Sequence, residues 1–85
     1  MHAHASHVSA ERRRLSDLAV GDRATVDRVD FSCPTARRFV ALGFSPGATV
    51  TLARLAPLAD PMEFDVRGAR VSLRRSDAAA VWVRA

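Results

Sequence analysis

The feature that most constrains the fold is a segment in which apolar and charged residues alternate without a break. Met62, Phe64 and Val66 alternate with charged residues over 62–67, and a weaker alternation of the same period extends over 48–53. A period of two places all the apolar side chains of a strand on one face. Both segments are therefore predicted to be antiparallel strands with one face in the core and the other in solvent.

Three further short strands complete the predicted sheet. The segment 23–30 alternates with one slip, which is typical of a β-bulge. Residues 67–70 are predicted to form a two-residue hairpin turn of type II′, with Gly68 at the first central position, after which the chain returns as a strand through 71–73. A last short strand is expected at 81–83.

One short helix is predicted after the first strand. Pro34 suits the first turn of a helix, where its missing N–H is no loss, and Phe39 and Leu42 lie three residues apart on one apolar stripe. Gly43 stands where a left-handed residue commonly ends a helix. Phe44 is then placed to fold back on Phe39.

These elements predict an all-β domain. About five short antiparallel strands, with one short helix after the first strand, describe a small, partly open barrel, and one helical turn capped by Ser76 is expected before the last strand. A chain of 85 residues suffices for one domain. Residues 1–14 show neither alternation nor a helical stripe and are predicted to be a disordered tail, so that the domain extends over 15–85.

The residues that usually carry catalysis or bind metals are few and scattered. Cys33 is the single cysteine, which excludes an intramolecular disulfide and is typical of a reducing compartment. His2, His4 and His7 all lie in the predicted tail, which offers no preorganised geometry for a metal. The sequence suggests no pair of nucleophile and base and contains no glycine-rich phosphate loop. We therefore expect no catalytic site and no cofactor, and direct binding of ferrous iron is the least supported function.

The charge of the chain leaves one alternative open. It carries 13 basic and 9 acidic residues, a formal net charge of +4, so a small barrel that binds nucleic acid is conceivable. All the basic residues are arginine, and they are spread along the chain. Neither a secretory leader nor an apolar run long enough to cross a membrane is present, so a cytoplasmic protein is expected.

Four segments, taken in order, resemble the ferrous iron transport protein A (FeoA) family. They are Leu15, Leu18 and Gly21; Arg37-Arg38-Phe39 with Leu42-Gly43-Phe44-Ser45-Pro46-Gly47; Ala56-Pro57-Leu58-Ala59-Asp60-Pro61; and Arg67-Gly68 with Leu73-Arg74-Arg75. The resemblance extends from about Leu15 to Val83, and the histidine-containing tail is not part of the family pattern.

The resemblance implies an SH3-like barrel that acts in ferrous iron uptake. Members of the family resemble cytoplasmic adaptors or regulators of FeoB, a membrane transporter with a cytoplasmic GTPase domain. The expected partner is therefore the cytoplasmic portion of a FeoB-like transporter, with no specific nucleic acid, no insertion into the membrane, and weak self-association left open. Similar domains occur at the C-terminus of metal-dependent repressors, so a protein-interaction domain related to those repressors is an alternative.

Seven residues are predicted to contact the partner: Phe44, Leu58, Asp60, Arg67, Arg70, Arg74 and Arg75. The four arginines surround one hairpin and together could meet an acidic surface of a partner, the alternative being an ordinary solvated face. Phe44 and Leu58 stand beside loops, where burial in the core is the alternative. With the loop 56–61, the arginine-bearing hairpin is expected to form one contact edge.

Overall fold

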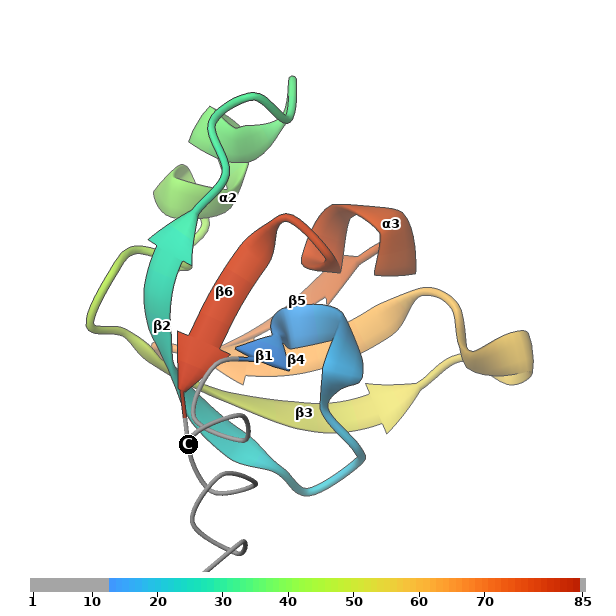
Figure 1. The fold of residues 1–85 in the computed structure, drawn as a ribbon. Helices are drawn as coiled ribbons and strands as arrows, with labels where there is room; N and C mark the ends of the chain where they lie inside the picture. Colours follow the sequence, from blue (N-terminus) through green and yellow to red (C-terminus); the bar gives the residue numbers. More distant parts are fainter. Residues whose placement is uncertain (1–12, 85) are drawn as a thin grey trace, which may run out of the picture.

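The computed structural model describes residues 13–84, which form one curled antiparallel sheet with short helices around it (Figure 1). Its strands are β1 (Arg13–Arg14), β2 (Arg23–Val29), β3 (Thr49–Leu55), β4 (Met62–Val66), β5 (Ala69–Leu73) and β6 (Val81–Arg84). Its helices are η1 (Leu15–Asp17), α2 (Ala36–Ala41), η2 (Pro57–Ala59) and α3 (Arg75–Ala78). The strand order is β1-β6-β2-β3-β4-β5, so β1 and β5 are the edges of the sheet. The predicted all-β class is confirmed.

The slip in the alternation of β2 is a bulge, as predicted. The pairing of β2 with β6 shifts between Val26 and Arg28, and this shift lets Val26 and Val29 both face the core although they are three residues apart. A second shift, which the sequence did not suggest, lies between Leu52 and Arg54 in the pairing of β3 with β4.

Helix α2 ends as the sequence predicts. Gly43 has a φ of 116°, its N–H donates to the Val40 carbonyl, and the Phe44 N–H donates to the Phe39 carbonyl, which together form a Schellman motif. The helix begins at Ala36, two residues later than expected.

The core is built around aromatic residues that α2 and the sheet contribute. Phe39, Phe44 and Phe64 are all buried, and the rings of Phe44 and Phe64 meet edge to face with their centroids 5.8 Å apart. The prediction that Phe44 contacts a partner is wrong, because the Schellman closure turns its side chain inward and leaves none of it exposed.

The boundary of the predicted tail also needs correction. Arg13 and Arg14 form β1, which pairs with β6, and the Arg14 guanidinium lies 4.6 Å from the ring centroid of Trp82, its cross-strand partner. A strand of two residues carries no alternation, so the sequence could not reveal it. The rest of the predicted tail, with its three histidines, lies outside the described residues.

The β4–β5 hairpin has a different turn from the one predicted. Arg67 and Gly68 are the central residues, with φ of 52° and 81°, and Val66 pairs with Ala69, so the turn is of type I′. The type II′ turn would have moved each pairing by two residues, which keeps the same side chains on the core face. The Arg67 guanidinium donates to Ser45 Oγ at 3.2 Å and thereby supports the left-handed conformation of Arg67.

Replacing Phe39 with alanine should destabilise the domain severely. The side chain is fully buried at the junction of α2 and the sheet, so Phe39→Ala is expected to cost about 3–5 kcal/mol of unfolding free energy. The exposed neighbour Arg37 provides the control, and Arg37→Ala should change stability by about 0.5 kcal/mol or less. Thermal melts of both variants test this. Equal midpoints would contradict the packing described for α2.

Candidate partner-binding surface

The loop between β3 and β4 presents a fully exposed leucine at its tip. Leu58 is 99% exposed and has a φ of 67°, and Ala59 follows with a φ of 66°. Such values cost about 1–3 kcal/mol each in residues other than glycine and persist only where the surroundings enforce them. The Ala56 N–H donates to the Pro61 carbonyl at 3.1 Å, and the Ala59 N–H donates to the Ala56 carbonyl at 2.8 Å. The loop therefore holds its own shape while presenting Leu58 to solvent.

The side chain of Arg75 fixes this loop to the body of the domain. Its Nε and Nη2 donate to the Ala59 carbonyl at 3.3 and 3.2 Å, and its Nη1 donates to the Ser16 carbonyl at 2.9 Å. The planar guanidinium fork can serve both carbonyls at once, which a lysine ammonium cannot do in this geometry. Arg75 was predicted to contact a partner, but in this structure its donors are used within the fold.

Asp60 has a structural role as well. Its Oδ1 accepts the backbone N–H of Arg75 at 2.9 Å, so it satisfies the first turn of α3 from a distant part of the chain. The predicted cap, Ser76, does not serve, because α3 begins one residue before it. Sequence spacing could not show this contact, since the cap and the helix lie in different segments.

The predicted contact edge is divided between the two ends of the hairpin. Arg67 and Arg70 lie toward the β4–β5 turn, whereas Arg74 follows Leu73 at the other end, which pairs with Met62 beside the loop 56–61. Arg70 Nε donates to Asp65 Oδ1 at 2.7 Å, and this hydrogen bond, with the charges of Asp65 and Glu63, raises the pKa of Arg70. Arg70 is therefore already ion-paired on the sheet surface.

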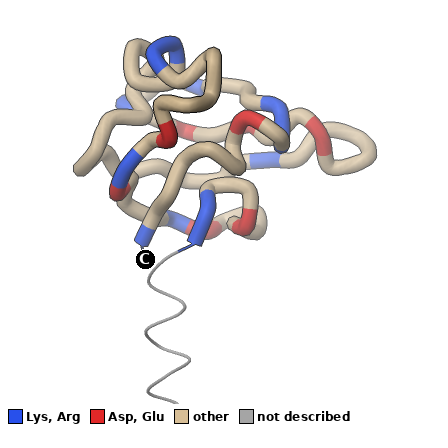
Figure 2. The backbone as a smooth tube through the Cα atoms, turned by 45° about the horizontal axis from the view of Figure 1, so that its top comes forward, with Lys and Arg blue, Asp and Glu red and all other residues tan. Residues whose placement is uncertain are grey.

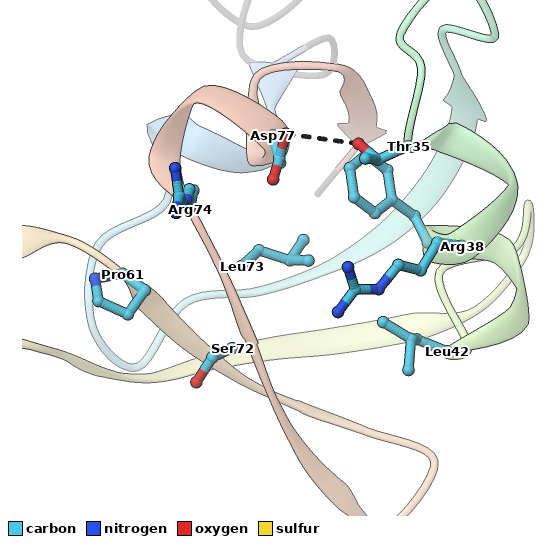
Figure 3. Close-up of a pocket in the computed structure, with 9 residues that line it drawn as sticks. Thr35, Arg38, Leu42, Pro61, Ser72, Leu73, Arg74 and Asp77 are labelled. Atoms are coloured by element: carbon cyan, nitrogen blue, oxygen red, sulfur yellow. Dashed lines mark hydrogen bonds between the residues drawn. The ribbon is translucent and has the colours of Figure 1, made fainter.

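A cleft that the sequence did not reveal lies between α2, β5 and α3 (Figure 3). Its volume is about 350 Å³, and it is lined by Thr35, Arg38, Phe39, Leu42, Pro61, Ser72, Leu73, Arg74 and Asp77. Arg38 and Leu42 stand on one side, Pro61 and Arg74 on the other, and Leu73 lies between them. Arg38 belongs to the polar face of α2, and only the folded chain places it opposite Arg74.

The cleft continues toward the loop 56–61. Asp60, Pro61 and Arg74 line a shallow hollow next to it, so Arg74 borders both. We call Leu58, Pro61, Arg74 and the cleft together the loop–cleft surface. Of the predicted contact residues, Leu58 and Arg74 are exposed on this surface, whereas Asp60 and Arg75 shape it.

Within residues 13–84, no group of three or more histidine, cysteine, aspartate or glutamate residues is placed to hold a metal ion. Cys33 Sγ lies 3.4 Å from the hydroxyl of Thr35. None of the helices in this part of the chain is long and apolar enough to cross a membrane.

Comparison with known proteins identifies the domain type. The family model described as the FeoA domain matches residues 13–85 and so begins at the first residue of β1. A relative from Porphyromonas gingivalis, the Fe(2+) transport protein A/Fe(2+) transporter FeoB fusion protein, is 41% identical over 70 residues. These residues are 82% of this chain but 8% of the relative, so the chain spans only a small part of that protein.

Solved structures share the fold. The solution structure of FeoA from Chlorobium tepidum is 38% identical with a TM-score of 0.78, over 85% of this chain and 69% of that chain. The crystal structure of zinc-complexed FeoA from Stenotrophomonas maltophilia, described as an SH3 domain protein, is 32% identical with a TM-score of 0.74, over 84% and 88% of the two chains. A manganese-dependent transcriptional repressor is 27% identical with a TM-score of 0.77, over 87% of this chain and 41% of that chain.

Replacing Arg75 with lysine should loosen the loop 56–61. The change removes the fork that donates to Ala59 and Ser16, and we expect a loss of about 1–3 kcal/mol of unfolding free energy. Amide hydrogen exchange at Ala59 should also become faster. Arg74→Lys is the matched control, because the Arg74 side chain makes no hydrogen bond or ion pair with another described residue, and it should change stability by about 0.5 kcal/mol or less. Equal denaturation midpoints for the two variants would contradict the role of Arg75.

Proposed function

Because the chain belongs to the FeoA domain family, we propose that it is an accessory regulator of ferrous iron uptake that docks on the cytoplasmic portion of a FeoB-type transporter. The observation that carries this proposal is the fusion protein of P. gingivalis, which bears the names of both components in one polypeptide. A covalent link keeps two domains at high effective concentration, and separate chains that act together need a docking surface instead. We place that surface on the cytoplasmic side of the transporter.

The loop–cleft surface has the physical properties that such docking requires. Leu58 offers a large apolar side chain that is free to enter a pocket, and Arg74, which lines a hollow with Asp60 and Pro61 of the same loop, offers a guanidinium for a carboxylate of the partner. The hydrogen bonds that hold the loop reduce the conformational entropy that binding would otherwise cost. We expect a reversible, micromolar contact in which charges such as that of Arg74 act mainly on the association rate.

We propose a binding module rather than an enzyme. The Cys33 thiol makes a side-chain hydrogen bond with the Thr35 hydroxyl, which is too weak a base to activate it. The regulatory effect would then arise from docking itself.

The rival function, binding of nucleic acid, has weaker support. Arginine and acidic residues are interspersed over the backbone (Figure 2), and Arg54 and Arg70 form ion pairs with Glu63. A phosphate-binding face usually gathers its cations without such neutralisation. The other alternative, a protein-interaction domain like that of the repressor, would also bind a protein segment. It differs from our proposal only in which protein is bound.

Leu58→Asp should weaken binding to the detergent-solubilised transporter at least tenfold, or about 1.4 kcal/mol, because it places a charge on the proposed apolar anchor. The melting temperature should not change, since the side chain is fully exposed. Phe31→Asp is the control, because Phe31 is also exposed but lies in the turn between β2 and α2. Arg74→Glu should behave like Leu58→Asp.

Isothermal titration calorimetry at two salt concentrations measures these affinities. Binding to the transporter should weaken only moderately with salt, whereas binding to duplex DNA through several phosphates falls steeply. Unchanged affinity of both Leu58→Asp and Arg74→Glu, or tight binding to DNA alone, would overturn the proposal.

A further inference from the structure

Strand β5 is an edge of the sheet whose outward backbone groups are unpaired within the described residues. In a hairpin with a two-residue turn, the residues that flank the turn, here Val66 and Ala69, exchange hydrogen bonds, and the pairs then alternate along the ladder. The pairs Asp65–Arg70 and Glu63–Ser72 are therefore the non-hydrogen-bonded ones. The N–H and C=O groups of Arg70 and Ser72 consequently point away from β4, toward the open edge.

Helix α2 lies alongside this edge and touches the domain at both of its ends. At its N-terminal end, the Thr35 hydroxyl donates to Asp77 Oδ1 of α3 at 3.5 Å (Figure 3). At its C-terminal end, Gly43 packs so closely on the hairpin that a Cβ atom there would lie 2.8 Å from Val66 Cγ1. Between the two contacts, the cleft separates α2 from β5, so that a helix forms one wall and a strand edge the other.

The side chains in this groove favour an acidic ligand. Leu42, which is 40% exposed, supplies apolar surface, and Leu73 lies beneath it as part of the core. Arg38 and Arg74 stand on opposite walls and form no hydrogen bond or ion pair with another described residue. The one carboxylate in the lining, Asp77, accepts the hydroxyl hydrogen bond from Thr35. The groove thus combines an apolar strip with two available guanidinium groups.

We propose that the groove between β5 and α2 binds an extended, acidic segment of a partner protein, which adds to the sheet as a strand next to β5. Its backbone would pair with Arg70 and Ser72, an apolar side chain would pack on Leu42, and its carboxylates would meet Arg38 and Arg74. This inference deepens the proposed function and rests on it only for the identity of the partner. A second copy of the chain is a poorer occupant, because its own β5 carries arginines that would face those of the groove.

The test is an NMR titration of the full-length, isotopically labelled chain with three capped peptides of eight residues. The first alternates glutamate with valine, the second alternates lysine with valine, and the third repeats the first with every backbone nitrogen methylated. The first should bind, with shift changes at Arg38, Arg70 and Ser72 and with slower hydrogen exchange of the Arg70 and Ser72 amides. The lysine peptide should fail because of its charge, and the methylated peptide because it lacks the N–H groups that a strand needs.

Three outcomes would overturn the proposal. These are binding of the methylated peptide as strong as that of the unmethylated glutamate–valine peptide, shift changes confined to another face, and concentration-dependent pairing of β5 with a second copy. Arg38→Glu should weaken the glutamate–valine peptide at least tenfold, whereas Arg37→Glu, exposed on the same helix but outside the cleft, should weaken it less than threefold. Equal losses for the two variants would mean that the attraction is only a matter of net charge.

The backbone itself can be tested separately. Ser72→Pro removes an N–H that makes no bond to β4, a change that edge strands tolerate, and it should abolish binding. If that variant does not fold, the same test is made on the peptide by methylating every second backbone nitrogen. Methylation of the nitrogens that face β5 should abolish binding, whereas methylation of those that face away should preserve it. If these peptides fail while the transporter still binds through Leu58, the groove is wrong and the docking function stands. If the glutamate–valine peptide binds but the transporter does not, the groove binds an acidic strand of a protein other than the transporter.

Discussion

The strands of this domain form an open barrel, and the guanidinium of Arg75 connects its two unpaired edges. The sheet ends at β1 on one side and at β5 on the other, and no strand pairing within residues 13–84 joins these edges. Arg75 follows β5 by two residues and donates to Ser16, which follows β1 by two residues, so one side chain connects the two edges. The same guanidinium also donates to the Ala59 carbonyl, and the backbone N–H of Arg75 donates to Asp60 Oδ1. Arg75 thus adds the loop 56–61 to η1 and α3, which already share the core through Leu15 and Ala78.

The closure by a side chain rather than by a ladder has a consequence for binding. A closed barrel has no free edge, whereas this one joins its edges only beyond the end of β5 and leaves the outward groups of Arg70 and Ser72 available. The loop that presents Leu58 ends at Met62, which pairs with Leu73 at the end of β5. The exposed Leu58 and the open edge of β5 therefore both depend on the hydrogen bonds of Arg75 that join the edges of the sheet.

The parts of the fold that follow local patterns could be predicted from the sequence. The alternation around Phe64 revealed β4, and Gly43 after an apolar stripe revealed the end of α2. The turn type at Gly68 could not be predicted, because the two alternatives differ by a shift of two residues that keeps the same faces buried. The pairing of β1 was hidden for another reason, since it depends on Trp82 far along the chain.

The candidate site was predicted only in part, and the errors have a common cause. Leu58 and Arg74 are both exposed and remain candidates for contact with a partner, but Phe44 is in the core and Arg75 is engaged inside the fold. A sequence shows that an arginine is present, but its role depends on which carbonyls the folded chain brings within reach. Arg38 was missed because a basic residue on the polar face of a helix looks like any solvated charge.

Photo-crosslinking in native membranes tests the central claim most directly, namely that the region anchored by Arg75 contacts the ferrous iron transporter. A photoreactive phenylalanine analogue at position 58 should give one dominant adduct, whose mass and peptide sequences belong to a cytoplasmic portion of the transporter. The same analogue at position 31, in the turn on another part of the domain, should give much less of it. Equal adducts from both positions, or adducts from position 58 with nucleic acid or unrelated proteins alone, would contradict the account.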